Sequence, residues 1–147
     1  MSAASLSDDW ARVASLVAAV DASLGKWLDD NYRVGLTEYR ALDLIAAAPE
    51  KELRVNDLAV QIGLNQSSVT RLIGRLETKE LARRDVCPAD GRGVYAVITT
   101  NGEALVDDVH KAYADRITEL LAGPPRDRWS GGELRQALRS IAQLIPK

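Results

Sequence analysis

The sequence predicts a mainly α fold with a small β wing, in which a winged helix-turn-helix lobe is joined to terminal helices. The first observation is a segment whose apolar side chains recur at i, i+3, i+4 and i+7 from Val69 to Leu76, which is typical of a helix packed on a core. The second is a pair of β-prone runs, residues 81–87 and 94–99, separated by turn-forming residues. The third is a set of long apolar stripes near both ends of the chain.

A shorter helix is expected just upstream, over residues 55–64. Two helices joined by a tight, glycine-containing turn form the helix-turn-helix arrangement, whose second helix enters a groove of DNA. The same pattern also fits any pair of amphipathic helices in a helical domain. The expected parts are Asn56 as N-cap, Val55 and Val60 as a hydrophobic staple, Gly63 as the C-terminal stop and Leu64-Asn65 as the turn.

The face of the second helix opposite its apolar stripe is short, polar and positive. It carries Ser67, Arg71, Gly74 and Thr78. Arginine bonds two acceptors of guanine in the major groove, and serine or threonine bonds a phosphate or a base edge. This face therefore predicts a helix that reads double-stranded DNA.

The two β-prone runs predict a hairpin whose tip carries an arginine. Arg92 lies between Gly91 and Gly93, and Asp90 is close enough in sequence to hold its guanidinium in a charge-assisted pair. An arginine presented in this way suits the narrow, negative minor groove. The alternative is that these residues form only a polar hairpin loop.

Residues 67–85, the tip at 90–92 and the segment 98–102 together resemble the MarR (multiple antibiotic resistance regulator) family of bacterial transcription factors. The resemblance extends over essentially the whole chain, because helical segments flank the motif in the family's order. Glu80 stands where the family usually has glycine, so the reading helix is expected not to end in the left-handed glycine type, and Ala96 stands where valine is usual. The resemblance implies that the residues facing DNA are Gln66, Ser67, Ser68, Thr70, Arg71 and Arg75 on the helix and Asp90 and Arg92 in the wing.

Two regions are expected: a DNA-binding lobe at 36–99, and a helical dimerisation region formed by 1–35 and 100–147. The lobe is expected to begin with a bracing helix that is capped by Thr37 and stops before Pro49.

The terminal helices are expected to pair with a second copy of the chain. Their apolar stripes run from Trp10 to Leu28 and from Leu105 to Leu121, and a last helix opens at a capping box, Ser130 to Glu133. A homodimer is expected because groove readers pair to match two half-sites of a pseudo-palindromic operator, about 34–36 Å apart. A monomeric helical bundle is the alternative.

Composition excludes several classes of function. The 147-residue chain is 46% apolar, and its formal charge of −2 with a pI near 5.4 argues against an indiscriminate nucleic-acid coat. No signal-peptide layout is present, and no apolar run approaches the roughly 20 residues of a membrane span, so we expect a cytoplasmic protein with no membrane partner. The sequence contains no nucleophile–base set, phosphate-binding glycine loop or metal cluster, which predicts neither an enzyme nor a bound cofactor or metal.

Regulation is expected from the resemblance alone. The family often binds small aromatic or phenolic effectors in a cleft between dimer helices and DNA-binding lobe, which implies a repressor that its effector releases. Trp27, Tyr32, Tyr39 and His110 are the side chains available to line such a cleft. Core packing is nevertheless the favoured interpretation of Trp27 and Tyr39, and a solvated or ion-paired side chain that of His110. Two alternatives stay open: a redox-responsive regulator that acts through Cys87, and a winged-helix protein–protein adaptor without DNA binding.

Overall fold

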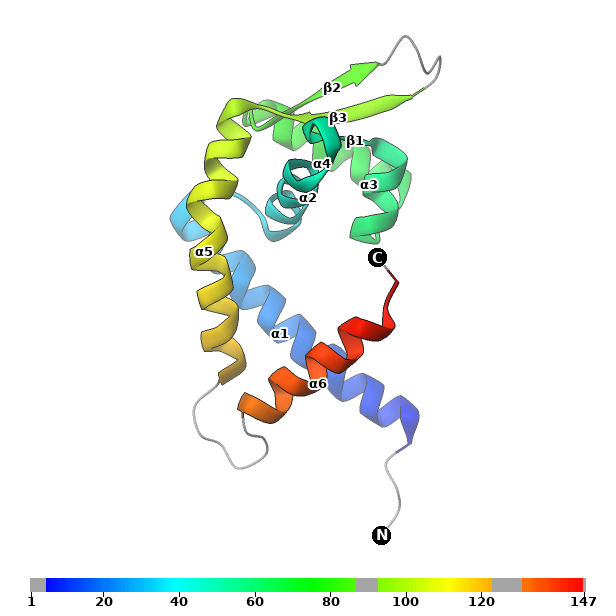
Figure 1. The fold of residues 1–147 in the computed structure, drawn as a ribbon, viewed down its shortest axis with the longest axis vertical. Helices are drawn as coiled ribbons and strands as arrows, with labels where there is room; N and C mark the ends of the chain where they lie inside the picture. Colours follow the sequence, from blue (N-terminus) through cyan, green and yellow to red (C-terminus); the bar gives the residue numbers. More distant parts are fainter. Residues whose placement is uncertain (1–4, 87–92, 123–130, 147) are drawn as a thin grey trace. The chain divides into compact units, whose positions relative to one another are not determined.

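The computed structural model describes residues 5–86, 93–122 and 131–146 (Figure 1). Its described strands form an antiparallel sheet with residues 94–98 in the central strand, and the predicted winged helix-turn-helix fold class is confirmed. Cys87, Asp90, Arg92 and Ser130 lie outside the described residues. In chain order the elements are α1 (Leu6–Tyr32), α2 (Leu36–Ala47), the 3-10 helix η1 (Pro49–Lys51), β1 (Glu52–Arg54), α3 (Val55–Ile62), α4 (Gln66–Thr78), β2 (Ala82–Val86), β3 (Val94–Ile98), α5 (Thr100–Ala122) and α6 (Gly131–Leu144).

The chain divides into two compact units. One comprises residues 25–111, and the other comprises residues 1–24 together with 112–147. Both boundaries lie inside the long helices α1 and α5. The last turns of α1 and the first turns of α5 therefore belong to the same unit as the winged helix.

The core of the 25–111 unit is built on the predicted stripe of α4. Val69, Leu72, Ile73 and Leu76 are all fully buried. Each such side chain contributes roughly 1.5–3 kcal/mol relative to an exposed position. Because these four side chains face the core, the opposite side of α4 is left to solvent. The other large, fully buried side chains of this unit include Leu28, Val34, Tyr39, Leu42, Ile45, Leu58 and Val109.

The start of α3 differs from the prediction. β1 pairs with β3 through Arg54 and Tyr95, and the chain passes directly from that strand into the helix at Val55. Asn56 is therefore inside the first turn and does not cap it, and the expected staple is absent because Val60 is 82% exposed. β1 went unpredicted because three residues are too few to show alternation. The predicted stop is confirmed, since Gly63 ends α3 in the left-handed conformation with φ 76°.

The start of α2 also differs. The helix begins at Leu36 with Gly35 at the N-cap, so Thr37 lies within the first turn rather than capping it. Glu38 makes the capping contact instead, because its Oε2 accepts a hydrogen bond from the Gly35 N–H at 3.1 Å. The helix ends at Ala47, before Pro49 as predicted.

The end of α4 is a left-handed turn without glycine, which corrects the expectation from the sequence. Glu80 adopts φ 59°. The Leu81 N–H bonds the Leu76 carbonyl and the Glu80 N–H bonds the Glu77 carbonyl, both at 2.9 Å, which is the Schellman pattern. Leu81 and Leu76 are both buried, so the apolar contact that usually accompanies this motif holds Glu80 in a conformation that glycine adopts more easily.

The described part of the other unit leaves many apolar side chains in water. On α1, Trp10 is 70% exposed, and on α6, Leu144 is 83% exposed. Val13, Val17 and Ile141 are exposed as well. The predicted stripes are therefore helical, but within one chain they are not buried along their length. None of the described helices is long and apolar enough to span a membrane.

Candidate nucleic-acid interface

The first turn of α4 is organised by Asn65, which caps it. Its Oδ1 accepts hydrogen bonds from the Ser68 N–H and from the Ser67 hydroxyl, each at 2.9 Å. The cap leaves Gln66 and Ser67 exposed at the positive end of the helix dipole, where an anion such as a phosphate is favoured. From the sequence, Asn65 is predicted only as part of the turn. An asparagine directly before the first helical residues is a signal that would have identified the cap.

The predicted contact residues share the solvent side of α4. Gln66, Ser67, Thr70, Arg71 and Arg75 are exposed, and Ser68 is partly buried. The Thr70 hydroxyl donates to the Gln66 carbonyl at 2.9 Å, so that side chain is held close to the helix. Among the described residues Arg71 has no carboxylate partner, which makes it the cation of this face most open to an external anion.

Strand β2 is fastened to α4 by Arg84. Its guanidinium donates to the Thr70 carbonyl at 2.9 Å and pairs with Glu77 at 3.1 Å. A hollow of about 330 Å³ adjoins α4 and β2, and Arg54 and Val94 from the neighbouring strands are among the residues that line it. The wing strands therefore have a defined position beside the reading face. No local pattern in the sequence indicates this role of Arg84, because both of its partners lie on another element.

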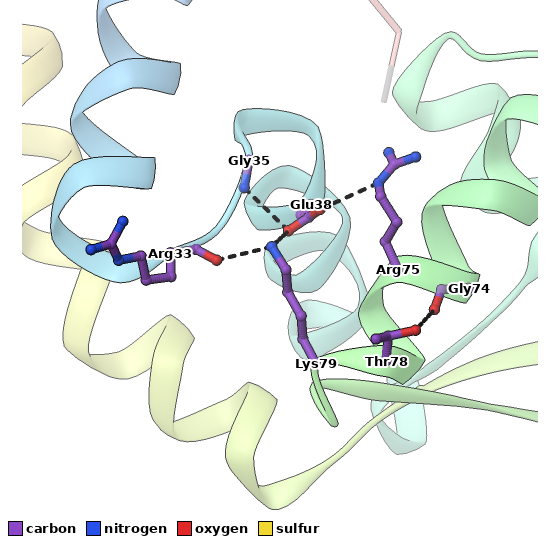
Figure 2. A network of polar contacts seen from close by, with 7 residues as sticks. All are labelled: Arg33, Gly35, Glu38, Gly74, Arg75, Thr78 and Lys79. Atoms are coloured by element: carbon purple, nitrogen blue, oxygen red, sulfur yellow. Dashed lines mark hydrogen bonds and ion pairs between the residues drawn. The ribbon is translucent and has the colours of Figure 1, made fainter.

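A buried carboxylate lies behind the C-terminal half of α4 (Figure 2). Glu38 pairs with Lys79 at 2.7 Å and with the Arg75 Nε at 3.3 Å. The Lys79 ammonium also donates to the Arg33 carbonyl at 2.9 Å. Burial raises the pKa of the Glu38 carboxyl, but hydrogen bonds from Lys79, Gly35 and Arg75 outweigh it and hold the pKa below its ordinary value.

The residues expected to line an effector cleft do not gather in one place. Trp27 and Tyr32 meet edge to face with ring centroids 5.4 Å apart. Tyr39 is a core side chain, only 1% exposed, and His110 lies on the surface. A cavity of about 350 Å³ does exist in this unit, and of the four candidates only Tyr32 lines it. Its lining is Tyr32, Arg33, Val34, Lys79, Leu81 and Leu105.

The described residues contain no candidate site for a metal ion. No group of three His, Cys, Asp or Glu side chains among residues 5–86, 93–122 and 131–146 is placed to hold an ion.

Comparison with known proteins agrees with this geometry. Residues 34–93 match the model of the MarR family. The chain is 31% identical over 86 residues to the HTH-type transcriptional regulator MhqR of Bacillus subtilis (strain 168). That match covers 58% of this chain and 58% of MhqR, so it spans less than two thirds of the relative's length.

Solved structures extend the likeness over nearly the whole chain. Sco3205, a MarR family transcriptional regulator from Streptomyces coelicolor solved in complex with DNA, superposes with a TM-score of 0.79 at 20% identity over 98% of this chain and 88% of that one. A MarR family transcriptional regulator from Rhodococcus sp. RHA1 gives 0.73 at 26% identity over 97% and 99% of the two chains. Apo MarR from E. coli gives 0.76 at 20% identity over 99% and 100%. The winged-helix part of the chain, residues 34–93, therefore matches the MarR family, and solved MarR family regulators share its fold over nearly the whole chain.

Proposed function

We propose that this protein is a sequence-specific regulator of transcription that binds double-stranded DNA through α4. The observation that carries the proposal is the two-sided character of this helix. Four apolar side chains anchor it in the core, while a capped N-terminus and an exposed polar face that includes Arg71 are presented to solvent. That combination suits insertion into the major groove.

Each candidate contact has a chemical role in this proposal. Arg71 bonds guanine acceptors or a phosphate, and the amide of Gln66 suits an adenine edge. The N–H groups and hydroxyls of the first turn suit phosphate oxygens. Asp90 and Arg92, from the resemblance alone, complete the set as a wing contact in the minor groove.

We further propose a homodimer that binds a pseudo-palindromic operator. The exposed apolar side chains of α1 and α6 support it, because large apolar side chains in water are unfavourable and a second copy of the same helices would cover them. The paired lobes would then address two half-sites one helical turn apart.

The most specific part of the proposal is that the protein represses transcription and that a small aromatic effector relieves this repression. The cavity beside Tyr32 supports it, since about 350 Å³ lies within the usual range for small-molecule pockets of roughly 300–1,000 Å³ and the lining combines apolar and cationic side chains. Calorimetric titration with hydroxybenzoates, in the presence and absence of bound operator, tests this part. Binding that is unaffected by the operator would contradict it.

DNA binding is tested by fluorescence anisotropy on duplexes that tile the DNA flanking the gene for this protein. We expect one duplex to bind far more tightly than a scrambled sequence of the same composition. Arg71→Ala should weaken that binding by about 5-fold to 150-fold, the equivalent of roughly 1–3 kcal/mol. Arg116→Ala is the matched control, because it removes the same charge from an α5 pair with Glu119 and should leave affinity unchanged.

Two results would overturn the proposal. One is wild-type protein that does not discriminate among the duplexes, which would favour the adaptor alternative. The other is an Arg71→Ala variant that binds as tightly as the wild type. Light scattering at micromolar concentration tests the dimer separately, and a monomeric full-length chain would contradict it.

A further inference from the structure

Both carboxylate oxygens of Glu38 accept hydrogen bonds, and two of the three donors are side chains at the end of α4. Oε2 accepts from the Gly35 N–H at 3.1 Å and from the Lys79 ammonium at 2.7 Å, and Oε1 accepts from the Arg75 Nε at 3.3 Å. The Glu38 side chain is only 7% exposed. Figure 2 shows the carboxylate between the Arg75 and Lys79 side chains. This carboxylate therefore ties the first turn of α2 to the last turns of α4.

The two cations that Glu38 holds also line the solvent side of α4. Arg71, Gly74, Arg75, Thr78 and Lys79 border an open hollow of about 400 Å³ along that helix. The Arg75 side chain is 55% exposed and that of Lys79 37% exposed, so both stay within reach of an external polyanion. Each is nevertheless anchored at its polar end, Lys79 doubly, because it also bonds the Arg33 carbonyl.

An anchored cation and a free one bind DNA differently. A free lysine or arginine neutralises any phosphate it reaches, which raises affinity for every sequence alike. A cation that shares a buried carboxylate gives up part of that affinity, because breaking the pair would leave the carboxylate buried without a partner. Its direction is also fixed, which favours one register of the helix on the duplex.

We infer that Glu38 is a positioning residue that restrains Arg75 and Lys79 and so makes DNA binding selective rather than merely tight. The inference rests on the proposed function, since it concerns the same face of α4. According to this inference, Arg75 contacts the DNA backbone in a fixed direction and does not read base edges. It also explains why the buried side chain at position 38 is charged, which packing alone does not require.

The test compares Glu38→Gln with Glu103→Gln. Both variants lose one negative charge, but Glu103 lies on α5 and pairs with Lys51, which is outside α4. Heparin chromatography measures release of the cations without any need for an operator. We expect Glu38→Gln to elute at higher salt than Glu103→Gln. The double variant Glu38→Gln/Lys79→Gln, which restores the local charge, should return toward the wild-type elution.

With duplex DNA, the slope of log K against log salt for a non-operator sequence should steepen in Glu38→Gln by about 0.9 for each cation released. The ratio of operator to non-operator affinity should fall. Thermal melting of all variants separates this effect from loss of structure, since a purely structural role would lower the melting temperature and leave elution at the level of the Glu103→Gln control.

Equal elution of the two single variants would overturn the inference. A wild-type protein that binds no duplex selectively would overturn the proposed function instead, while the heparin comparison would still decide whether Glu38 restrains the cations. The two failures are therefore distinguishable.

Discussion

Gly102, in the first turn of α5, has no room for a side chain. A Cβ built on its backbone would lie 2.1 Å from the Leu81 carbonyl oxygen and 2.6 Å from the Ile98 Cγ1. The Leu81 carbonyl cannot easily move, because it accepts the Thr99 N–H at 3.1 Å. Thr99 is itself fixed, since its hydroxyl donates to the Glu80 carbonyl at 2.7 Å. The predicted perturbation is Gly102→Ala.

Overpacking typically costs about 1–3 kcal/mol, and the upper end applies here because the nearest atom belongs to the backbone. Alanine regains up to about 1 kcal/mol through its better helix propensity. The free energy of unfolding should therefore fall by about 2 kcal/mol, which lowers Tm by roughly 4–8 °C for a chain near this size.

Differential scanning calorimetry at fixed protein concentration measures the change. Gly25→Ala in the middle of α1 is the matched control, because its Cβ would meet only the Leu36 Cβ at 3.8 Å, an ordinary contact. That variant should raise the free energy of unfolding by about 0.5–1 kcal/mol. A Gly102→Ala protein that melts at or above the wild-type temperature would refute the steric reasoning.

Three further predictions concern the lobe. Glu80→Gly should raise the free energy of unfolding in urea by about 0.5–1 kcal/mol, because glycine adopts the left-handed turn without strain, and an unchanged or lower value would contradict this. Asn65→Ala should lower it by about 1 kcal/mol through loss of the cap on the Ser68 N–H, whereas Asn65→Asp should retain it; equal losses in both would count against the cap. The pKa of Glu38 is lowered in the folded protein, so its contribution to stability is fully present above its ordinary value of 4.5 and is lost as pH falls through the folded value. The difference in unfolding free energy between wild type and Glu38→Gln should therefore narrow between pH 7 and pH 3, and a constant difference would show that the charge is not what stabilises.

Local patterns predicted the parts of the fold that local physics determines. The stripe on α4 follows from helical periodicity, and the stop at Gly63 follows from the ease with which glycine adopts positive φ. The same local rules failed at Glu80. There the burial of Leu81 and two backbone hydrogen bonds outweigh a backbone strain of about 1–2 kcal/mol, and no property of the residue at that position signals this.

From the sequence, only the exposed positions of the candidate site could be predicted. Exposed positions on α4 follow from periodicity, but the partners of its cations do not. Glu38 is separated from Arg75 by 37 residues and from Lys79 by 41. Its position in the first turn of α2 suggests a capping residue, and only the packing of α2 against α4 brings it to these two side chains.

Ion pairs determine which of the positive side chains on and beside α4 are available to an external anion. Arg75 and Lys79 share Glu38, Arg83 pairs with Asp85 at 3.5 Å, and Arg84 pairs with Glu77. Exposed pairs such as the last two are worth roughly 0–1 kcal/mol, so a phosphate displaces the carboxylate at little cost. The pairs to Glu38 exchange less readily, because its carboxylate is buried. Under the proposed function, the surface around α4 therefore offers DNA one cation without a described carboxylate partner, Arg71, and one readily exchangeable cation, Arg83. Arg84 is also held by the Thr70 carbonyl, and Arg75 and Lys79 are restrained by Glu38. A face with few free cations depends on matched contacts for its affinity, and for a protein of net negative charge such dependence is what distinguishes an operator from the rest of the DNA.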